Sequence, residues 1–462
     1  METGQPPANT SSLGKERLLR ILGVTFGVAV GIGGTIGIGI LRIPGSVAAQ
    51  LGHSGLIMGA WIVSGLYAFA GANTYAELGT MLPLDGGPYV YARRAYGEFG
   101  GFLVGWSDWL LRTSSMAYLA VALTEYAAGV FSYNAAVITP AAIAVLILFT
   151  AFHWLGLRVG SRAQEIMSLF KVLAFFVIIA ACFFFSPKLS AAPSANPSPF
   201  SDPKLLFVAI ALSMQSILGT YSGWHAPVYF SEENTDPSKS IPRSLFTGVA
   251  FVTAIYVLIN LGILHALPIS KLAGSKLAAA DAAQLMFGGY SSQVVTGIML
   301  VSLLGIINAS FLFTPRVMFA LSRDGLFFRS GAMVNTGGTP TTALLITTVV
   351  AIMLASVGSF DKLFAFTALL SVLVDVAAFG TLFVLRWREP NLPRPFRARG
   401  YPVLPAIVFI GAGLLLIAFL VSSLENSLYA AIGIAVSYPV YRLVKKLVNA
   451  VAVWSGNAPL TS

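Results

Sequence analysis

Long, nearly uninterrupted apolar segments constrain this chain more than any other feature of its sequence. Twelve such segments follow one another, separated by short polar or basic connections. They are expected at 19–45, 55–80, 98–130, 135–157, 163–186, 203–231, 243–268, 290–321, 340–357, 361–386, 403–423 and 427–444. A helix needs about 20 apolar residues to cross a bilayer. The pattern therefore predicts an all-α polytopic membrane protein with twelve transmembrane helices.

The composition excludes the main alternatives to a membrane protein. Only 10% of the 462 residues are charged and 56% are hydrophobic, whereas soluble proteins carry about 25% charged residues. A water-soluble enzyme and a disordered chain are both excluded, since disorder needs low hydrophobicity and high charge. A transmembrane barrel would show short alternating strands rather than these continuous runs. The single cysteine, Cys182, rules out a disulfide within the chain.

The positions of the basic residues predict the orientation in the membrane. Twenty of the 28 lysines and arginines lie in alternate connections, beginning with the N-terminal one. Only five lie in the opposite connections: Lys188, Lys204, Lys271, Lys276 and Lys362. Because positive residues concentrate on the cytoplasmic side, both termini are expected in the cytoplasm. The same asymmetry explains the net charge of +10 without any need for a nucleic-acid partner.

Two segments carry residues that interrupt a helix. Six glycines lie within 31–45, and Gly219, Gly223 and Pro227 lie near the middle of 203–231. These are the first and sixth segments, so they hold matching positions in two sets of five. Interrupted helices at matching positions are the best sequence indication of a transporter binding site. The freed N–H groups could hold a carboxylate and the freed carbonyls an ammonium, which together suit a zwitterion. Close packing of helices through small residues is the simpler alternative for either segment alone.

Four motifs resemble one known family when taken in order. They are GTIGIGILRIPG at 34–45, YAELGTMLPLDGGPYVYARRAYGEFGGFLVGW at 75–106, TYSGWHAPVYFSEENTDPSKSIPRS at 220–244 and TPRVMFALSRDGLF at 314–327. The sequence resembles the amino acid–polyamine–organocation (APC) superfamily of transporters, with weaker likeness beyond about residue 330. The YSGW element is most similar to the L-amino acid transporter branch.

The resemblance implies a fold and a mechanism. The fold would be a five-plus-five inverted repeat with two further helices, in which helices 1, 2, 6 and 7 rock against a scaffold. The expected parts are a cytoplasmic tail at 1–18, repeats at 19–186 and 203–386, two helices within 403–444 and a cytoplasmic tail at 445–462.

The resemblance also implies a substrate site at the two interruptions. Backbone groups of the first would contact the α-carboxylate and α-amine of an amino acid, and the second would line the pocket. The expected substrate-binding residues are Thr35, Ile36, Gly37, Ile38, Gly39, Thr220, Tyr221, Ser222, Gly223 and Trp224. For Trp224, simple helix packing is an equally good interpretation.

Lys171 and Asn308 are the expected coupling residues. Lys171 lies about two helical turns inside the fifth segment, where an ionisable residue is a candidate functional site. Sodium-independent members of the family place a lysine here, where sodium-coupled relatives bind a cation. The ammonium would bridge the first and eighth helices, although the side chain could instead reach the cytoplasmic headgroups. Asn308 matches a polar family position that faces the first helix.

Other polar residues in the apolar segments have open roles. Asp108 and Arg112 are four residues apart and are expected to pair on one helix face. Asp375 could exchange a proton during transport or bond to a neighbouring helix. Arg42 could face an outer vestibule and favour acidic substrates, or simply reach the headgroups, which is the preferred interpretation. His225 could make a pH-sensitive contact, but a satisfied core residue is the simpler hypothesis.

The predicted function is secondary active transport of amino acids, neutral L-amino acids in particular, by alternating access in a bacterial inner membrane. Coupling by exchange or by proton symport is expected, independent of sodium. No cofactor, metal or disulfide-linked heavy chain is expected, because the histidines lack metal-ligand spacing and the connection near 131–136 has no cysteine. Two alternatives stay open: a transporter of polyamines or cationic amines, which should carry carboxylates near the interruptions, and an amino-acid sensor without net flux.

Overall fold

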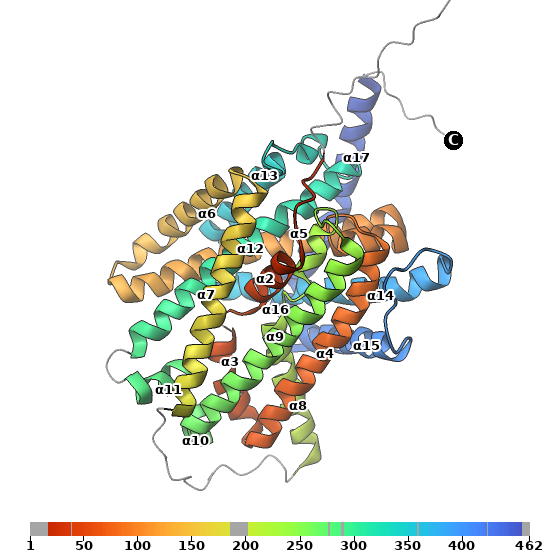
Figure 1. Ribbon diagram of the computed structural model, residues 1–462. Helices are drawn as coiled ribbons and strands as arrows, with labels where there is room; N and C mark the ends of the chain where they lie inside the picture. Colours follow the sequence, from red (N-terminus) through yellow and green to blue (C-terminus); the bar gives the residue numbers. More distant parts are fainter. Residues whose placement is uncertain are drawn as a thin grey trace, which may run out of the picture.

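The structure is a computed structural model that describes residues 17–37, 39–184, 202–275, 278–287, 291–357, 360–422 and 424–454. Within these ranges the chain is helical, with two isolated β-bridges and no strand (Figure 1). The first half contains α2 (Val24–Thr35), α3 (Gly39–Leu51), α4 (Ser54–Met81), α5 (Pro88–Phe131), η2 (Ala135–Val137), α6 (Ile138–Trp154) and α7 (Leu157–Phe184). The second contains α8 (Pro203–Tyr221), η4 (Ala226–Phe230), α9 (Pro237–Ala266), α10 (Ile269–Leu272), α11 (Ala278–Phe287), α12 (Ser291–Arg323), η6 (Arg329–Ala332), α13 (Thr341–Val357) and α14 (Phe360–Arg388), followed by α15 (Val403–Ser422), α16 (Leu424–Ala435) and α17 (Ser437–Trp454).

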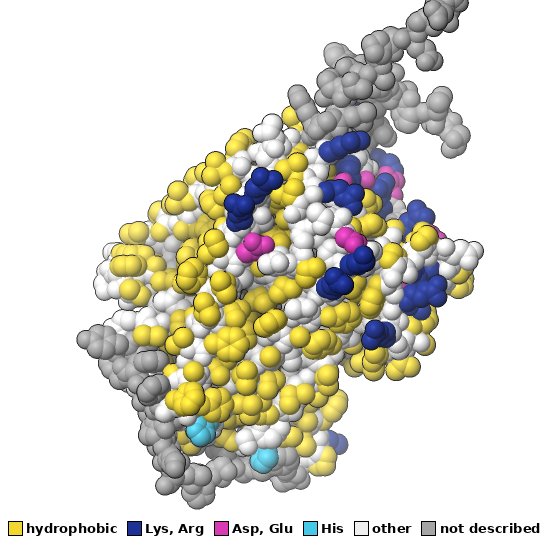
Figure 2. Space-filling model, viewed as in Figure 1, with side chains coloured by type: hydrophobic (Ala, Val, Ile, Leu, Met, Phe, Trp, Pro, Cys, Tyr) yellow, Lys and Arg dark blue, Asp and Glu magenta, His cyan; other side chains and the backbone are white. Residues whose placement is uncertain are grey.

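The surface of the molecule is that of a membrane protein. Eight helical segments of the described chain are long and apolar enough to cross a bilayer, and the bent pair α2–α3 would make a ninth. Large apolar side chains such as Phe207 and Phe184 are exposed, at 74% and 81%. Figure 2 shows hydrophobic side chains over most of the visible face, while lysines, arginines and acids gather toward its upper and right-hand parts. A soluble monomer does not expose apolar patches of this extent, which confirms a multi-pass membrane protein.

The first predicted span is displaced from the observed helices. Residues 19–23 precede α2, and α3 continues past 45 to Leu51 with Pro44 inside it. Leu22 leaves the helical conformation because its backbone pairs with Asn234, a tertiary contact that apolar composition does not reveal. Pro44 removes one backbone donor without ending α3. The range 19–45 was therefore wrong at both ends.

The last predicted span is not one helix. The range 427–444 is divided near Val436 into α16 and α17. Pro439 has no N–H to donate to the carbonyl of Ala435 four residues earlier, so the hydrogen-bond ladder is interrupted there. Lys445, in the middle of α17, forms an ion pair with Glu98 of α5 at 2.6 Å, so α17 lies beside α5.

Two groups of helices pack together within the molecule. One contains the segments α2–α3, α4, α8–η4 and α9, and the other is built on α5, α6, α7, α12 and α13. The groups meet where α2 lies against α7 and α12, and where α9 lies against α7. In Figure 1, α4 lies beside α9 although the two are far apart in sequence. This interface between the groups contains the predicted interruptions.

Candidate site at the two helix breaks

The first predicted interruption is present between α2 and α3. Thr35 ends α2, Ile36 adopts an extended conformation (φ −73°, ψ 110°), and α3 begins at Gly39. The axes of the two helices differ by 49°. Thr35, Ile36, Gly37 and Gly39 therefore lie at the break, whereas Ile38 lies outside the described residues.

The second predicted interruption follows α8. Ser222 leaves the helical conformation (ψ 131°) and Gly223 has φ +114°, a value that L side chains rarely adopt. The chain then turns, and η4 begins at Ala226. Thr220 and Tyr221 form the end of α8 and are buried, while Ser222 is exposed.

The two breaks are in close contact, and each contact includes at least one glycine. A Cβ on Gly223 would lie 2.5 Å from the carbonyl oxygen of Gly34, and one on Gly39 would lie 2.7 Å from Cγ2 of Thr220. Glycine allows this close approach of backbones. The interrupted ends of α2 and α8, and the start of α3, therefore form one continuous region of peptide groups that lie outside regular helix.

Tyr256 of α9 contacts both breaks, and sequence reasoning missed it. Its hydroxyl lies 2.8 Å from the carbonyl oxygen of Thr220 and 3.1 Å from that of Thr35. The ring packs edge-on against Tyr221 and Trp61, at centroid distances of 4.9 and 5.5 Å. A hydroxyl has one proton, so the two carbonyls share a single donor. A buried tyrosine in an apolar helix is the only sequence signal, and it does not single out this residue.

Replacing Tyr256 by phenylalanine removes that donor from both carbonyls. Because the two carbonyls share one donor, the substitution removes one hydrogen bond, which contributes about 1 kcal/mol net, so exchange of a transported amino acid should fall by about 5- to 10-fold. Tyr96→Phe is the matched control, because the Tyr96 hydroxyl donates to the Ala377 carbonyl at 2.9 Å away from the breaks. Equal exchange rates for the two variants would show that Tyr256 does not hold the breaks.

Lys171 of α7 contacts the first break directly. Its Nζ donates to the carbonyl oxygens of Gly33 at 2.9 Å and Ile36 at 2.6 Å, and the side chain is fully buried. A Cβ on Gly305 of α12 would lie 3.4 Å from its Nζ. Among the described residues no acidic side chain forms an ion pair with Lys171. The ammonium therefore supplies the donors that the end of α2 lacks.

Asn308 is the centre of a polar chain that reaches α2 indirectly. Its Nδ2 donates to Oε1 of Gln164 at 2.8 Å, and its Oδ1 lies 3.1 Å from Nε2 of His153. Gln164 donates to Ser168 at 3.0 Å, and Ser168 donates to the Ala29 carbonyl of α2 at 2.7 Å. Asn308 thus joins α6, α7 and α12, and two further side chains separate it from α2.

A buried charged cluster lies beside the second break. Arg112 donates to Asp108 at 3.0 Å, which confirms the predicted pair, and to the Tyr229 hydroxyl at 2.6 Å. Its Nη2 also lies 2.8 Å from Nε2 of His225. Because a guanidinium can only donate, this nitrogen of His225 must accept, and the ring is neutral with its proton on Nδ1. The preferred hypothesis for His225, a satisfied core residue, fits this contact.

The remaining candidates have simpler surroundings. Trp224 packs edge-on against Tyr75 with ring centroids 5.3 Å apart. Asp375 is partly buried on α14, and Arg42 is exposed on α3. Among the described residues no group of histidine, cysteine or acidic side chains could hold a metal ion.

Contacts between distant parts of the chain close the site on one side of the breaks, where the chain enters α2. The Leu22 N–H donates to the Glu233 carbonyl, and the Leu22 carbonyl accepts from the Thr235 N–H, both at 3.0 Å. The rings of Phe26 and Phe230 pack edge-on at 5.0 Å. We call these contacts the inner closure, because the basic connections place them on the predicted cytoplasmic side.

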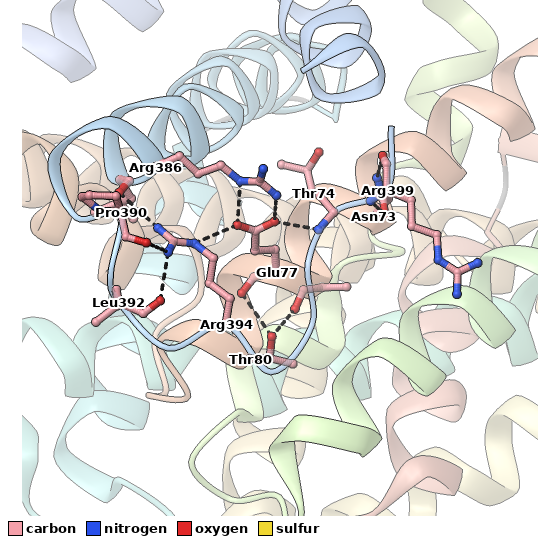
Figure 3. Close-up of polar contacts among 12 residues, drawn as sticks. Asn73, Thr74, Glu77, Thr80, Arg386, Pro390, Leu392, Arg394 and Arg399 are labelled. Atoms are coloured by element: carbon pink, nitrogen blue, oxygen red, sulfur yellow. Dashed lines mark hydrogen bonds and ion pairs between the residues drawn. The ribbon is translucent and has the colours of Figure 1, made fainter. Parts of the chain in front are cut away.

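A second set of polar contacts ties the connection between α14 and α15 to α4 (Figure 3). The buried carboxylate of Glu77 accepts hydrogen bonds from Arg386 and from the Ala398 N–H, the latter at 2.6 Å, and forms an ion pair with Arg394 at 3.1 Å. Two guanidiniums and a peptide N–H therefore surround one carboxylate, which is the arrangement that a buried charge needs. We call this set of contacts the Glu77 latch.

Further bonds extend the Glu77 latch along α4. Asn73 accepts from the Arg399 N–H and donates to the Arg399 carbonyl, both at 2.9 Å. Six residues earlier, the Tyr67 hydroxyl donates to the Val408 carbonyl of α15 at 2.8 Å. α4 is thus bonded both to the connection before α15 and to α15 itself.

Known proteins are similar to this chain over most of its length. A family model described as amino acid permease matches residues 18–442. The serine/threonine exchanger SteT of Bacillus subtilis is 28% identical over 435 residues, which cover 93% of this chain and 98% of that protein. The human large neutral amino acids transporter small subunit 2 is 28% identical over 416 residues, or 86% of this chain and 75% of that protein. The mouse Asc-type amino acid transporter 1 is 28% identical over 430 residues, or 91% and 79%.

Proposed function

The chain belongs to the amino acid permease family, and we propose that its two helix breaks bind the backbone of a neutral L-amino acid during transport. That it is a multi-pass membrane transporter of amino acids rather than an enzyme follows from the family and from relatives that are exchangers and transporters of amino acids. The observation that carries the proposal for the site is the direct contact between the breaks, at Gly34 and Gly223 and at Gly39 and Thr220.

The chemistry of the breaks suits the part that all amino acids share. The start of α3 offers N–H groups for the α-carboxylate, and the ends of α2 and α8 offer carbonyls for the α-ammonium. The expected binding residues stay Thr35, Ile36, Gly37, Ile38, Gly39, Thr220, Tyr221, Ser222, Gly223 and Trp224. A neutral side chain is supported by the lack of a carboxylate within 31–45 and 218–227, and by relatives named for serine, threonine and large neutral amino acids.

The packing supports an inverted repeat of five helices. If segments 1–5 and 6–10 are related by a two-fold axis, each helix near the axis contacts the corresponding helix of the other repeat. Such contacts occur between α3 and α8, α4 and α9, α5 and α12, and α6 and α13. The proposal therefore keeps repeats at 19–186 and 203–386, two additional helices within 403–444, and twelve spans in all. Both termini, at 1–18 and 445–462, would lie in the cytoplasm of a bacterial cell.

Alternating access would move one helix group against the other. α2, η4, α4 and α9 would rock against α5, α6, α7 and α12, and the breaks would open to each side in turn. Lys171 supports coupling without sodium, because its ammonium already holds the carbonyls of Gly33 and Ile36. Exchange or proton symport would then drive accumulation, with Lys171 and Asn308 as coupling residues.

Transport should therefore be independent of sodium. We expect purified protein in proteoliposomes to exchange radiolabelled serine, threonine or leucine at the same rate when choline replaces sodium, because a fixed ammonium occupies the position near the break. The measurement is uptake of an amino acid panel, with sodium and the pH gradient varied separately. Strict sodium dependence would overturn the coupling, and uptake of putrescine in place of neutral amino acids would overturn the substrate class.

A further inference from the structure

Two carboxyl groups are fully buried at the inner closure. Asp85 lies in the connection between α4 and α5, and Glu233 lies just after η4, where its backbone pairs with Leu22. Both residues have 0% exposure. A third carboxylate, that of Glu232, lies beside them with partial exposure. These acids lie outside the breaks, within the motifs at 75–106 and 220–244, and the transport mechanism proposed above assigns them no role.

The arginines nearby are already paired. Arg316 of α12 donates to both oxygens of Glu233, at 3.1 and 3.3 Å, and Arg323 donates to Glu232 at 2.6 Å. The remaining Nη1 of Arg316 donates to the Leu312 carbonyl at 2.7 Å. Neither guanidinium has a donor aimed at Asp85 among the described residues.

Asp85 is satisfied on one oxygen only. Its Oδ1 accepts from the Glu232 N–H at 2.7 Å, while its Oδ2 is buried and has no hydrogen-bond partner among the described residues. The carboxylates of Asp85, Glu232 and Glu233 outnumber the guanidiniums of Arg316 and Arg323 by one. If all three acids were ionised, one negative charge would be uncompensated, and Asp85 is buried away from water. Asp324 does not alter this balance, because Arg93 pairs with it at 2.6 Å.

Physical chemistry favours a proton on Asp85. Burial raises the pKa of Asp85 well above its usual value, and the negative charges of Glu233 and Glu232 add to that effect, while Arg316 acts against it. Burial also raises the pKa of Glu233, but its pairing with Arg316 opposes the rise directly. Of the other groups near Asp85, Arg323 is paired with Glu232 and Tyr91 is a neutral phenol.

We propose that Asp85 is a proton-binding site of the inner closure: the closed state holds one proton on Oδ2, donated toward Glu233, and opening releases that proton to water. This proposal rests on the alternating access proposed above, because opening must separate Leu22 from Glu233 and Glu233 from Arg316. A group that binds its proton more tightly in one state favours that state at low pH. Acidic pH therefore holds the inner closure shut, and rising pH releases it.

The first test is the pH dependence of exchange in Asp85→Asn. Asparagine has the shape of the protonated acid and cannot ionise. With equal pH on both sides, wild-type serine exchange should rise at least about threefold between about pH 5.5 and about pH 8, because burial raises the pKa of Asp85 above its usual value. Asp85→Asn should stay near the low-pH rate throughout. Asp236→Asn, which changes a carboxylate paired only with nearby Lys239 and Ser238, should keep the wild-type profile.

The second test follows the opening itself. Leu22→Cys places a thiol in the inner closure, and Ser238→Cys places one on an exposed site, so that the ratio of their maleimide labelling rates corrects for thiol ionisation. The ratio should rise with pH when Asp85 is present and stay constant in Asp85→Asn. The same pH dependence with and without Asp85, in exchange or in labelling, overturns the proposal.

The outcomes separate the two proposals. Absence of exchange for every amino acid would contradict the transport site, while labelling would still decide the role of Asp85. A difference between wild type and Asp85→Asn that disappears without sodium would assign the site to a metal cation, and would overturn the assignment to a proton.

Discussion

Lys171→Ala should abolish most amino acid exchange, by about 100-fold or more. The substitution leaves the Gly33 and Ile36 carbonyls without their donor, at about 1–3 kcal/mol for each buried unsatisfied group. Each 1.4 kcal/mol corresponds to a tenfold change in rate. The measurement is serine exchange in proteoliposomes at matched protein density, together with the thermal stability of the purified protein.

Two further variants make the Lys171 experiment decisive. Lys171→Met keeps an unbranched side chain without the ammonium, so it should lose as much exchange as alanine does. Lys239→Ala removes an exposed lysine whose ion pair among the described residues is with Asp236, and this variant should exchange at the wild-type rate. If Lys171→Met kept exchange within about threefold of wild type, the bonds to the break would not be needed for transport.

Gly223→Ala should cause a loss of at least about 30-fold. Its φ of +114° is strained for any residue with a Cβ, at about 1–2 kcal/mol. The added carbon would also lie 2.5 Å from the Gly34 carbonyl oxygen, so the breaks would have to separate at a further cost of about 1–3 kcal/mol. Serine exchange and its apparent affinity should both fall.

Gly219→Ala is the matched control for this substitution. Gly219 lies on α8 four residues earlier, and a Cβ there would meet nothing within 4 Å. Because alanine favours a helix over glycine by about 1 kcal/mol, this variant should fold at least as well as wild type and keep its exchange. Similar losses for both variants would show that α8 tolerates no added methyl group, and that the contact at Gly223 is not special.

The two helix interruptions could be predicted because the relevant signals are local. The glycines within 31–45, and the glycines and the proline within 218–227, weaken a helix whatever surrounds it. Both interruptions are present in the structure. Asp108 and Arg112 needed only helical spacing to be paired. The position of Lys171 inside an apolar segment likewise indicated that its ammonium must have buried hydrogen-bond partners.

The rest depends on contacts between segments far apart in sequence. Tyr256 looks like any buried tyrosine until folding brings Thr35 and Thr220 to its hydroxyl. Gln164 and Ser168 lie between Asn308 and α2, and nothing in their spacing predicts that order. Asp85 lies within the motif at 75–106, but the burial of its carboxyl group and the lack of a partner for Oδ2 among the described residues depend on the packing around it.

The Glu77 latch has a mechanical consequence for the last helices of the chain. The connection between α14 and α15 bonds to α4 at Ala398 and Arg399, and α15 itself bonds to α4 at Val408. Arg386 of α14 binds the carboxylate of Glu77 on α4. If α4 tilts during transport as proposed, α15 would move with it, and the length of the segment 389–402 would limit how far both helices can move away from α14.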